Sequence, residues 1–412
     1  MIKKLFYLFL FFAPFTSFFA VSSWLRLPVV INQLLFVVLI IAAFKNNKVK
    51  TKWILREDIF LLLFLGLVWL SLLFGYLEKR SFNHALAYTN SIFFYFFLSK
   101  YVITLLKVSS VEIAGVIYRS FLTCSFIIVT DFIGKNYFNI SLRQTFSEVD
   151  GAISNMDYFI RFGLYSVGGV AEEPGHMAIF YNIYFGISLY YLYLKKRFNN
   201  YRWLFVLFII CHFSLMSNAG IVLPIIAGFM IFMINKLKKL KISQKQVLIG
   251  LSTFVITALV IGIVMFFDIG KSSQFLEVFF DKIFFNESDR EYSSSGQRLK
   301  HWGRALSNFV KHPIFGNGPG FGVNEDTEGY LSVYLTVLSD IGLVAFLFFI
   351  SFQEALIRKV MKLKREIRNF LLFCVITSFL HLIIIADFYH APLWVLFVFI
   401  QLVYKEQKPI ES

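Results

Sequence analysis

The chain has 412 residues, of which 58% are hydrophobic and only 16% are charged, and its mean hydropathy is +0.69. A water-soluble fold needs a more polar surface than this, so the composition excludes soluble enzymes, nucleic-acid-binding proteins and fibrous proteins. The net charge of +15 comes from Lys and Arg residues in short clusters between apolar runs, as expected of membrane topology signals. We predict an all-α integral membrane protein.

Apolar runs of about 17–25 residues can cross a ~30 Å hydrocarbon core as helices. Two pairs of these runs are predicted to form tight hairpins, which turn at Ser217–Gly220 and at Asp387–Pro392. In chain order, about twelve transmembrane helices are predicted, at residues 5–22, 27–44, 58–77, 83–99, 111–133, 174–194, 201–217, 219–235, 246–267, 331–356, 369–387 and 388–404.

The positive charges alternate with these runs. If the N-terminus is cytoplasmic, roughly two-thirds of the Lys and Arg residues fall on the inner side, as the positive-inside rule requires. Both termini are therefore predicted in the cytoplasm. A cleaved signal peptide at Met1–Ala20 is the alternative, but its removal would not improve the charge alternation.

Two segments are longer than the other connections, and both fall on the predicted outer side. They are the first external loop, 134–173, and the second external loop, 268–330. Long loops usually carry function, and no linker or repeat separates a soluble domain. Residues 1–412 are predicted to form a single polytopic domain whose chemistry belongs to these loops and the adjoining helix ends.

The first external loop ends in a glycine-rich stretch followed by Glu173, Pro174, Gly175 and His176. Proline suits the first position of a helix, which leaves Glu173 as a cap at the positive end of the helix dipole. This is compatible with a purely structural cap. The alternative is functional, because ionisable residues at the membrane surface are site candidates and a carboxylate or imidazole there can accept a proton from a hydroxyl.

In the second external loop, residues 295–311 are predicted to form an amphipathic helix that stops before Pro313. One interpretation is an interfacial helix that rests on anionic headgroups. The other is that Arg298 and Arg304 bind a phosphate with their planar guanidinium groups. A basic and polar stripe marks one face of the helix: Arg298, His301, Arg304, Asn308 and Lys311.

The sequence HPIFGNGPGFG follows this helix and forces a sharp backbone path close to neighbouring helices or to a ligand. Its key residues are His312, Gly316 and Gly318, and an acidic run that includes Glu328 comes next. Among the other ionisable residues, Asp387 and His390 lie at an outer hairpin and form a reserve catalytic pair.

These motifs resemble a known signature. Arg298-x-x-x-Trp302, then His312-Pro313-x-x-Gly316-x-Gly318, then a helix with Gly342-Leu343 are similar to the signature of Wzy-type oligosaccharide repeat-unit polymerases and O-antigen ligases. Arg161 followed by a glycine-rich stretch and Glu173-Pro174 resembles the polymerases' arginine and Glu-Pro at a helix entrance.

The resemblance implies a GT-C-like membrane glycosyltransferase that works with inversion and needs no metal and no cofactor. Its donor and acceptor would be undecaprenyl-diphosphate-linked oligosaccharides, in contact with the lipid bilayer and not with nucleic acid. A chain-length regulator and a flippase are candidate partners. Arg161, Arg298 and Arg304 are then expected to hold the diphosphate, and Glu173, His176 and Glu328 are the candidate bases.

Three functions remain open. Ligases of this family use a histidine just before the span that follows the signature, and no histidine occurs from Gly320 to Ser339, which favours a polymerase. A transporter or flippase for the same lipid-linked sugars should show repeated halves, and the sequence shows none.

Overall fold

The computed structural model describes residues 1–20, 25–45, 54–76, 79–142, 160–161, 164–239, 294–325 and 329–407. Within these ranges the chain is mainly helical, and its one small sheet is the antiparallel hairpin β1 (Ile160–Arg161) and β2 (Leu164–Tyr165). The helices of the first half are α1 (Ile2–Phe12), α2 (Leu27–Lys45), α3 (Asp58–Phe74), α4 (Lys79–Thr89), the π-helical η1 (Asn90–Leu98), α5 (Ser99–Leu106), α6 (Ser110–Phe138) and α8 (Pro174–Leu194). The remaining helices are α9 (Asn200–Leu215), α10 (Asn218–Lys239), α13 (Ser294–Lys311), α14 (Phe321–Glu325), α15 (Val333–Thr336), η3 (Val337–Ile341), α16 (Leu343–Met361), α17 (Arg365–His381) and α18 (Ala391–Gln407).

Four described helices are long and apolar enough to cross a membrane, namely Arg80–Leu106, Ser110–Phe138, Pro174–Leu194 and Asn218–Lys236. Shorter apolar helices cover Leu27–Ala42, Asp58–Phe74 and Asn200–Leu215. The helical fold and these apolar lengths are consistent with a membrane protein. They do not establish twelve spans, and the run predicted at 246–267 lies outside the described residues.

Helix α8 is the centre of the fold. Most of its side chains are buried, because it packs between α6 and α17 and also contacts α9 and α18. Stacked aromatic rings fill these contacts, such as Phe121 with Tyr181 and Phe185 with Phe208. A helix that is buried on nearly all sides gives a fixed position to every residue at its ends.

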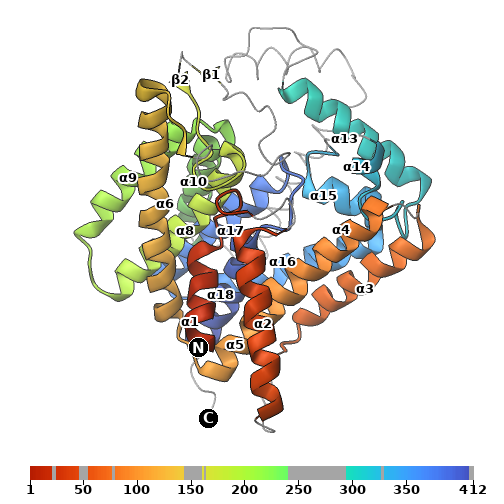
Figure 1. Ribbon diagram of the computed structural model, residues 1–412, viewed down its shortest axis with the longest axis horizontal. Helices are drawn as coiled ribbons and strands as arrows, with labels where there is room; N and C mark the ends of the chain where they lie inside the picture. Colours follow the sequence, from red (N-terminus) through yellow and green to blue (C-terminus); the bar gives the residue numbers. More distant parts are fainter. Residues whose placement is uncertain are drawn as a thin grey trace.

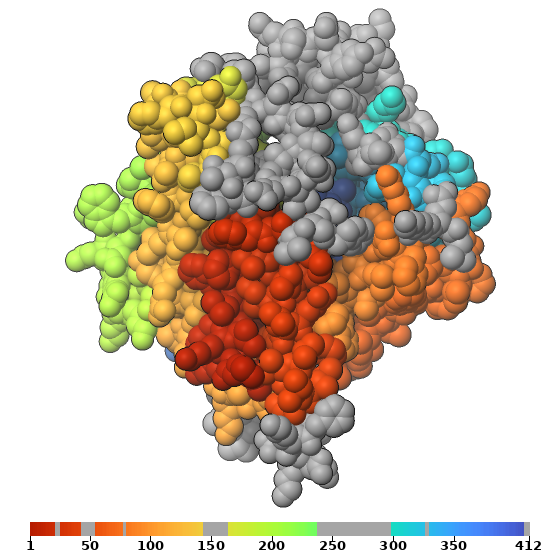
Figure 2. All heavy atoms as spheres, in the orientation of Figure 1, coloured from red at the N-terminus to blue at the C-terminus, as the bar shows by residue number. Residues whose placement is uncertain are grey.

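Figure 1 shows that the N- and C-termini lie at one end of the molecule, whereas the β1–β2 hairpin and the start of α13 lie at the other end. Helices α1 and α2 lie in the part of the molecule nearer the termini and form much of one face there (Figure 2). The parts of both predicted external loops that the structure describes therefore share the end opposite the termini.

The first predicted span, 5–22, is wrong in its extent. Helix α1 ends at Phe12, and the chain turns at Ala13–Ala20, where Phe15 and Phe18 are buried inside the protein. Pro14 cannot donate a backbone hydrogen bond, which favours the break. The buried Ser17 hydroxyl bonds the carbonyls of Val170 and Ala171, so apolar residues read as a span form a folded turn beside the first external loop.

The predicted span 331–356 is likewise interrupted, at Gly342. Gly342 has φ +95°, and a Cβ atom there would lie 2.2 Å from the carbonyl oxygen of Ile314. The glycine is needed because the backbone of the second external loop crosses the helix at this point. Short helices α15 and η3 therefore precede α16 instead of one continuous span.

Two further helix ends differ from prediction. Helix α6 continues to Phe138 and so includes the first residues assigned to the 134–173 loop. Helix α17 ends at His381 rather than at residue 387, which leaves 382–390 as a loop before α18. The second difference matters most, because it frees Asp387 from the helix.

Candidate active site

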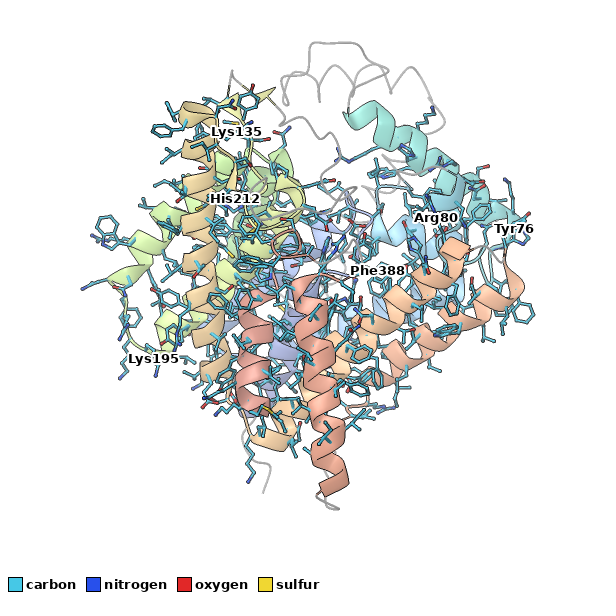
Figure 3. The ribbon with its side chains drawn as sticks, viewed as in Figure 1. Tyr76, Arg80, Lys135, Lys195, His212 and Phe388 are labelled. Atoms are coloured by element: carbon cyan, nitrogen blue, oxygen red, sulfur yellow. The ribbon has the colours of Figure 1, made fainter. Side chains whose placement is uncertain are left out.

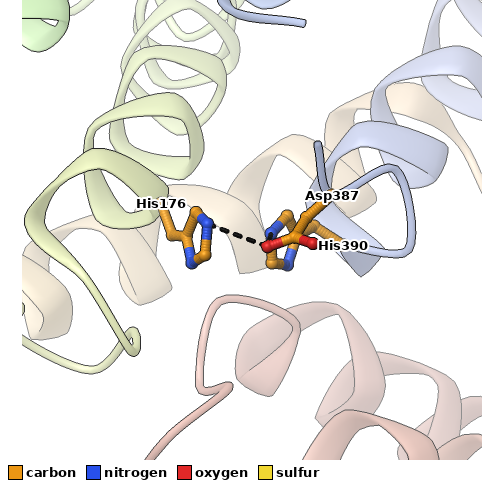
Figure 4. A group of neighbouring side chains, drawn as sticks. All are labelled: His176, Asp387 and His390. Carbon is orange, nitrogen blue, oxygen red and sulfur yellow. Dashed lines mark ion pairs between the residues drawn. The ribbon is translucent and has the colours of Figure 1, made fainter. Parts of the chain in front are cut away.

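His176 lies in the first turn of α8. Pro174 starts this helix and Glu173 occupies the extended N-cap position, as the sequence predicted, so the imidazole is held at the end of a rigid buried helix. Nε2 of His176 lies 3.0 Å from Oδ2 of Asp387, which comes from the loop between α17 and α18 (Figure 4). The structure thus joins a candidate base from the first external loop to a member of the reserve pair, about 210 residues away along the chain.

The Asp387 carboxylate has further partners. The Tyr389 hydroxyl donates a hydrogen bond of 2.5 Å to Oδ1, and Nε2 of His390 lies 3.8 Å from Oδ2. Burial alone would raise the pKa of Asp387, but the hydrogen bond from His176 outweighs it and holds this pKa below its usual range. Asp387 is therefore ionised at neutral pH and orients the imidazole of His176.

Glu172 closes the cluster on the other side of His176. Its Oε2 lies 3.8 Å from Nδ1 of His176, and its other oxygen forms an ion pair with Arg26, the residue before α2. Burial raises the pKa of Glu172, and the charge of Arg26 opposes that rise. The Arg26 guanidinium also lies 5.9 Å from the centre of the Tyr389 ring, so it connects Glu172 to the Asp387 loop.

Arg298 of α13 lies near the same helix entrance. Burial lowers the pKa of Arg298, and the negative charge of Glu173 partly offsets this effect. This coupling means that a guanidinium from the second external loop is close to a carboxylate from the first one. Because Arg298 remains protonated, it supplies positive charge beside the α8 entrance.

Arg304 makes contacts within the second external loop, and its expected role at the diphosphate stays a prediction. Its Nη2 donates a 2.6 Å hydrogen bond to the carbonyl of Gly329, and its guanidinium lies 5.3 Å from the centre of the Tyr330 ring. The distance from its Nε to Oε2 of Glu325 is 4.0 Å. Through these contacts Arg304 connects helix α13 to Glu325 and Gly329, which lie at the two ends of the acidic run.

The signature residues His312, Gly316 and Gly318 lie in a loop whose glycines pack against the backbone of Asp340. The His312 side chain is exposed, whereas Gly316 has φ +71° and a Cβ atom there would lie 2.4 Å from the backbone of Asp340. The amide of Gly318 donates to the carbonyl of Asp340 at 2.8 Å. The close backbone path that the sequence predicted is thus used to pack this loop against η3.

Two predicted site residues remain untested by the structure. Arg161 belongs to β1, but its side chain lies outside the described residues, as does Glu328. Both stay predictions.

Three residues of this cluster, His176, Asp387 and His390, lie close enough together to bind a metal ion. The potential ligand atoms of His176, Asp387 and His390 all lie within 4.8 Å of one another. Two imidazoles and a carboxylate are a suitable set for a metal such as zinc. The direct contact between His176 and Asp387 equally suits a hydrogen-bonded pair, so the expectation of a metal-independent enzyme stays a prediction.

Three residues of the cluster, Arg26, Glu172 and Tyr389, were not predicted from the sequence. A signal for Arg26 was present, since it is a lone cation at the predicted outer start of the second span. Glu172 directly precedes the predicted cap, and Tyr389 lies between the two residues of the reserve pair. Only the contact between the two loops shows that these residues belong together.

Comparisons with known proteins give one family match, which covers part of the chain. A protein-family model described as O-antigen ligase matches residues 203–350. No curated protein matches the chain. The family match confirms the resemblance to the superfamily of O-antigen polymerases and ligases, and it indicates a glycosyl-transferring enzyme of O-antigen assembly. It includes Arg298 and the signature loop but neither His176 nor Asp387, and it does not distinguish a polymerase from a ligase.

Proposed function

We propose that this relative of the O-antigen polymerases and ligases is a polymerase that joins lipid-linked oligosaccharide repeat units on the outer face of the bacterial cytoplasmic membrane. The growing glycan would move from its undecaprenyl diphosphate to the non-reducing end of an incoming lipid-linked unit. The observation that carries the proposal is the contact between the buried His176 imidazole and the half-buried Asp387 carboxylate, with the ion pair of Arg26 and Glu172 on the other side of His176. Arg298 interacts electrostatically with Glu173 at the start of the same helix.

His176 is the preferred base. When its Nε2–H donates to Asp387, the lone pair of Nδ1 is left to accept a proton, and among the described residues Nδ1 has no hydrogen-bond partner. The acceptor hydroxyl would attack the anomeric carbon and lose its proton to Nδ1. Asp387 would stabilise the imidazolium that forms, much as the buried aspartate of a hydrolase triad does. Glu173 is the second candidate for this role, and Glu328 the third.

The proposed role of the arginines is to stabilise the diphosphate leaving group. As the new glycosidic bond forms with inversion, the bond from the anomeric carbon to the diphosphate breaks and its electron pair leaves with the diphosphate. Guanidinium groups stabilise this developing charge well, because they can form two parallel hydrogen bonds to phosphate oxygens. Arg298 and Arg26 are positioned for this role, and Arg161 remains a candidate. The reaction needs no metal in this proposal.

Polymerase is preferred to ligase because the region from Gly320 to Ser339 contains no histidine. A ligase is the second candidate, since the matching family model bears that description. A transporter is less well supported, because the sequence shows no repeated halves.

The test is an assembly reaction with purified protein in liposomes. Lipid-linked repeat units alone should yield a ladder of lengthened glycans if the protein is a polymerase. A ligase would give no ladder from these units, and would instead transfer finished glycan to a lipid A-core acceptor. Absence of both products would refute glycosyl transfer.

A further inference from the structure

His390 is a buried histidine whose ring makes no hydrogen bond within the described part of the chain. The residue is 2% exposed, and neither Nδ1 nor Nε2 has a hydrogen-bond partner there. Its ring lies beside that of His176, with the two centroids 4.6 Å apart, and its Nε2 lies 3.8 Å from Oδ2 of Asp387. A buried polar group without a partner is costly unless a ligand supplies one. The roles proposed for His176 and Asp387 leave this histidine without a function.

The potential ligand atoms are spaced as in a metal site. Nε2 of His176 lies 3.0 Å from Oδ2 of Asp387, the same oxygen that His390 approaches, and ligand atoms of the three residues lie within 4.8 Å of one another (Figure 4). Around zinc, with tetrahedral bonds of ~2.0 Å, neighbouring ligand atoms are about 3.3 Å apart. Small side-chain rotations would therefore bring both imidazoles and the carboxylate onto one ion. Imidazole nitrogens favour a transition-metal dication such as Zn²⁺ over Mg²⁺, which prefers oxygen ligands.

The three residues are held by ordered parts of the fold. His176 lies in the first turn of α8, and His390 directly precedes α18. Beside Asp387, Phe388 is buried inside the helical bundle (Figure 3), and its ring stacks on that of Tyr88 of α4 with the centroids 3.5 Å apart. The Asp387 side chain is itself 24% exposed, which gives an ion a path to the site. Because the ligands are held in place before an ion binds, binding costs little conformational entropy.

The charges around the three residues are compatible with a dication. Arg26 forms an ion pair with Glu172, and Arg298 interacts electrostatically with Glu173. Each of these arginines thus has an acidic partner, and the Asp387 carboxylate remains as an additional negative group. A bound cation would compensate that carboxylate while it occupies the free nitrogen of His390.

We propose that His176, Asp387 and His390 form an inhibitory zinc site within the candidate active site. The inhibition, although not the binding, rests on the proposed function. Zinc would bind the lone pair of Nε2 of His176, so the one proton of the neutral imidazole would move from Nε2 to Nδ1. Nδ1 is the atom proposed to accept the proton of the acceptor hydroxyl, and it could no longer do so. Only the metal-free form would then transfer glycan.

Binding is tested with Zn²⁺ alone on the full-length protein, purified in liposomes and treated with a chelator. Equilibrium dialysis should give about one high-affinity zinc ion per chain, as expected of a single three-ligand site. His390→Gln should weaken this affinity by about tenfold or more, because loss of even an outer-shell partner of a ligand costs 10–100-fold. The matched control is His312→Gln, which removes an exposed histidine of the signature loop and should keep the wild-type affinity.

Equal zinc affinity in His390→Gln and wild-type protein would overturn the site. Melting temperatures show whether each variant is folded. If His390→Gln does not fold, Asp387→Asn makes the same comparison, because asparagine keeps the size of the side chain but removes the carboxylate ligand.

Inhibition is tested by ladder formation from lipid-linked units with and without Zn²⁺. Saturating zinc should lower the wild-type rate by about 10²-fold or more, the usual contribution of a general base. Chelation with EDTA should restore the rate, and Mg²⁺ should have no such effect. In His390→Gln, the zinc concentration that halves the variant's own zinc-free rate should rise by the same factor as the dissociation constant.

Two results would overturn the inhibition. One is a wild-type rate that bound zinc leaves unchanged or raises. The other is equal zinc sensitivity in wild type and His390→Gln, which would show that zinc acts on the diphosphate of the substrate. If no ladder forms even without zinc, the proposed function fails, and the dialysis measurement still decides whether the three residues bind the metal.

Discussion

The signature loop and the His176 cluster differ in what their characteristic residues do: those of the loop pack the backbone, and those of the cluster interact through ionisable side chains. The signature loop, His312–Gly320, places its glycines where the backbone passes within van der Waals distance of η3, and its histidine is exposed. The His176 cluster (His176, Asp387, His390, Glu172, Arg26 and Tyr389) instead brings ionisable side chains together in a buried place. The glycines of the signature loop thus serve the packing of the backbone, whereas the proposed proton transfer belongs to residues outside this loop.

The physical reason lies in what each region has to satisfy. A close backbone crossing needs glycine at fixed positions, and this requirement gives a compact motif in the sequence. A proton-transfer site needs only that a few groups meet in space, and α8 and the α17–α18 loop can supply them from distant positions. Four substitutions test this comparison.

Replacement of His176 should have the largest effect. His176→Ala removes the proposed base, so kcat is expected to fall by about 10²–10⁴-fold without loss of protein from the membrane. The assay is the formation of glycan ladders from lipid-linked units. His312→Ala is the control, because this exposed side chain lies in the signature but outside the cluster and its loss should leave the ladder intact. Equal loss in both variants would contradict the distinction.

Asp387→Asn should lower kcat by about 10–100-fold, as expected when a partner that orients a functional histidine is lost. The asparagine keeps the shape but cannot stabilise a positive imidazolium. His390→Gln is a useful companion, since His390 lies farther from Asp387 than His176 does and should cost less. A larger loss in His390→Gln would assign the base to His390.

Gly316→Ala should affect folding before activity. Its positive φ and the 2.4 Å approach to Asp340 make a methyl group unfavourable, by about 1–3 kcal/mol or more. The expected result is a lower melting temperature and less protein in the membrane. Gly66→Ala has open space and a helical backbone and should be neutral or slightly stabilising. Normal abundance together with lost transfer in Gly316→Ala would show that the loop contacts substrate.

Arg298→Lys should reduce kcat/KM by about tenfold, because an ammonium group cannot form the paired hydrogen bonds of a guanidinium. Arg304→Lys should alter stability instead, since Arg304 contacts Gly329 and Tyr330 within its own loop. Unchanged transfer in Arg298→Lys would return α13 to the role of an interfacial anchor.

The sequence alone determined the membrane class, the start of α8, the extent of α13 and the α9–α10 hairpin. Each depends on local rules: apolar length, the proline at a helix start, and the period of an amphipathic face. Local signals were also enough to select Glu173, His176 and Arg298 as site candidates. Local signals did not predict that helix α1 ends at Phe12 or that the helix is interrupted at Gly342. At both places other parts of the chain pack against apolar residues that resemble a membrane span.

The tertiary structure decided which candidates belong together. It brings His176 into contact with Asp387 and places Arg26 and Glu172 in the same cluster. It also shows that Arg304 contacts Gly329, a residue of its own loop. No local pattern contains this information, because the side chain of His176 meets Asp387 only after α8 has packed against α17. Partial burial of Asp387 also matters, because a half-buried carboxylate stays charged more readily when a partner such as His176 supplies a hydrogen bond.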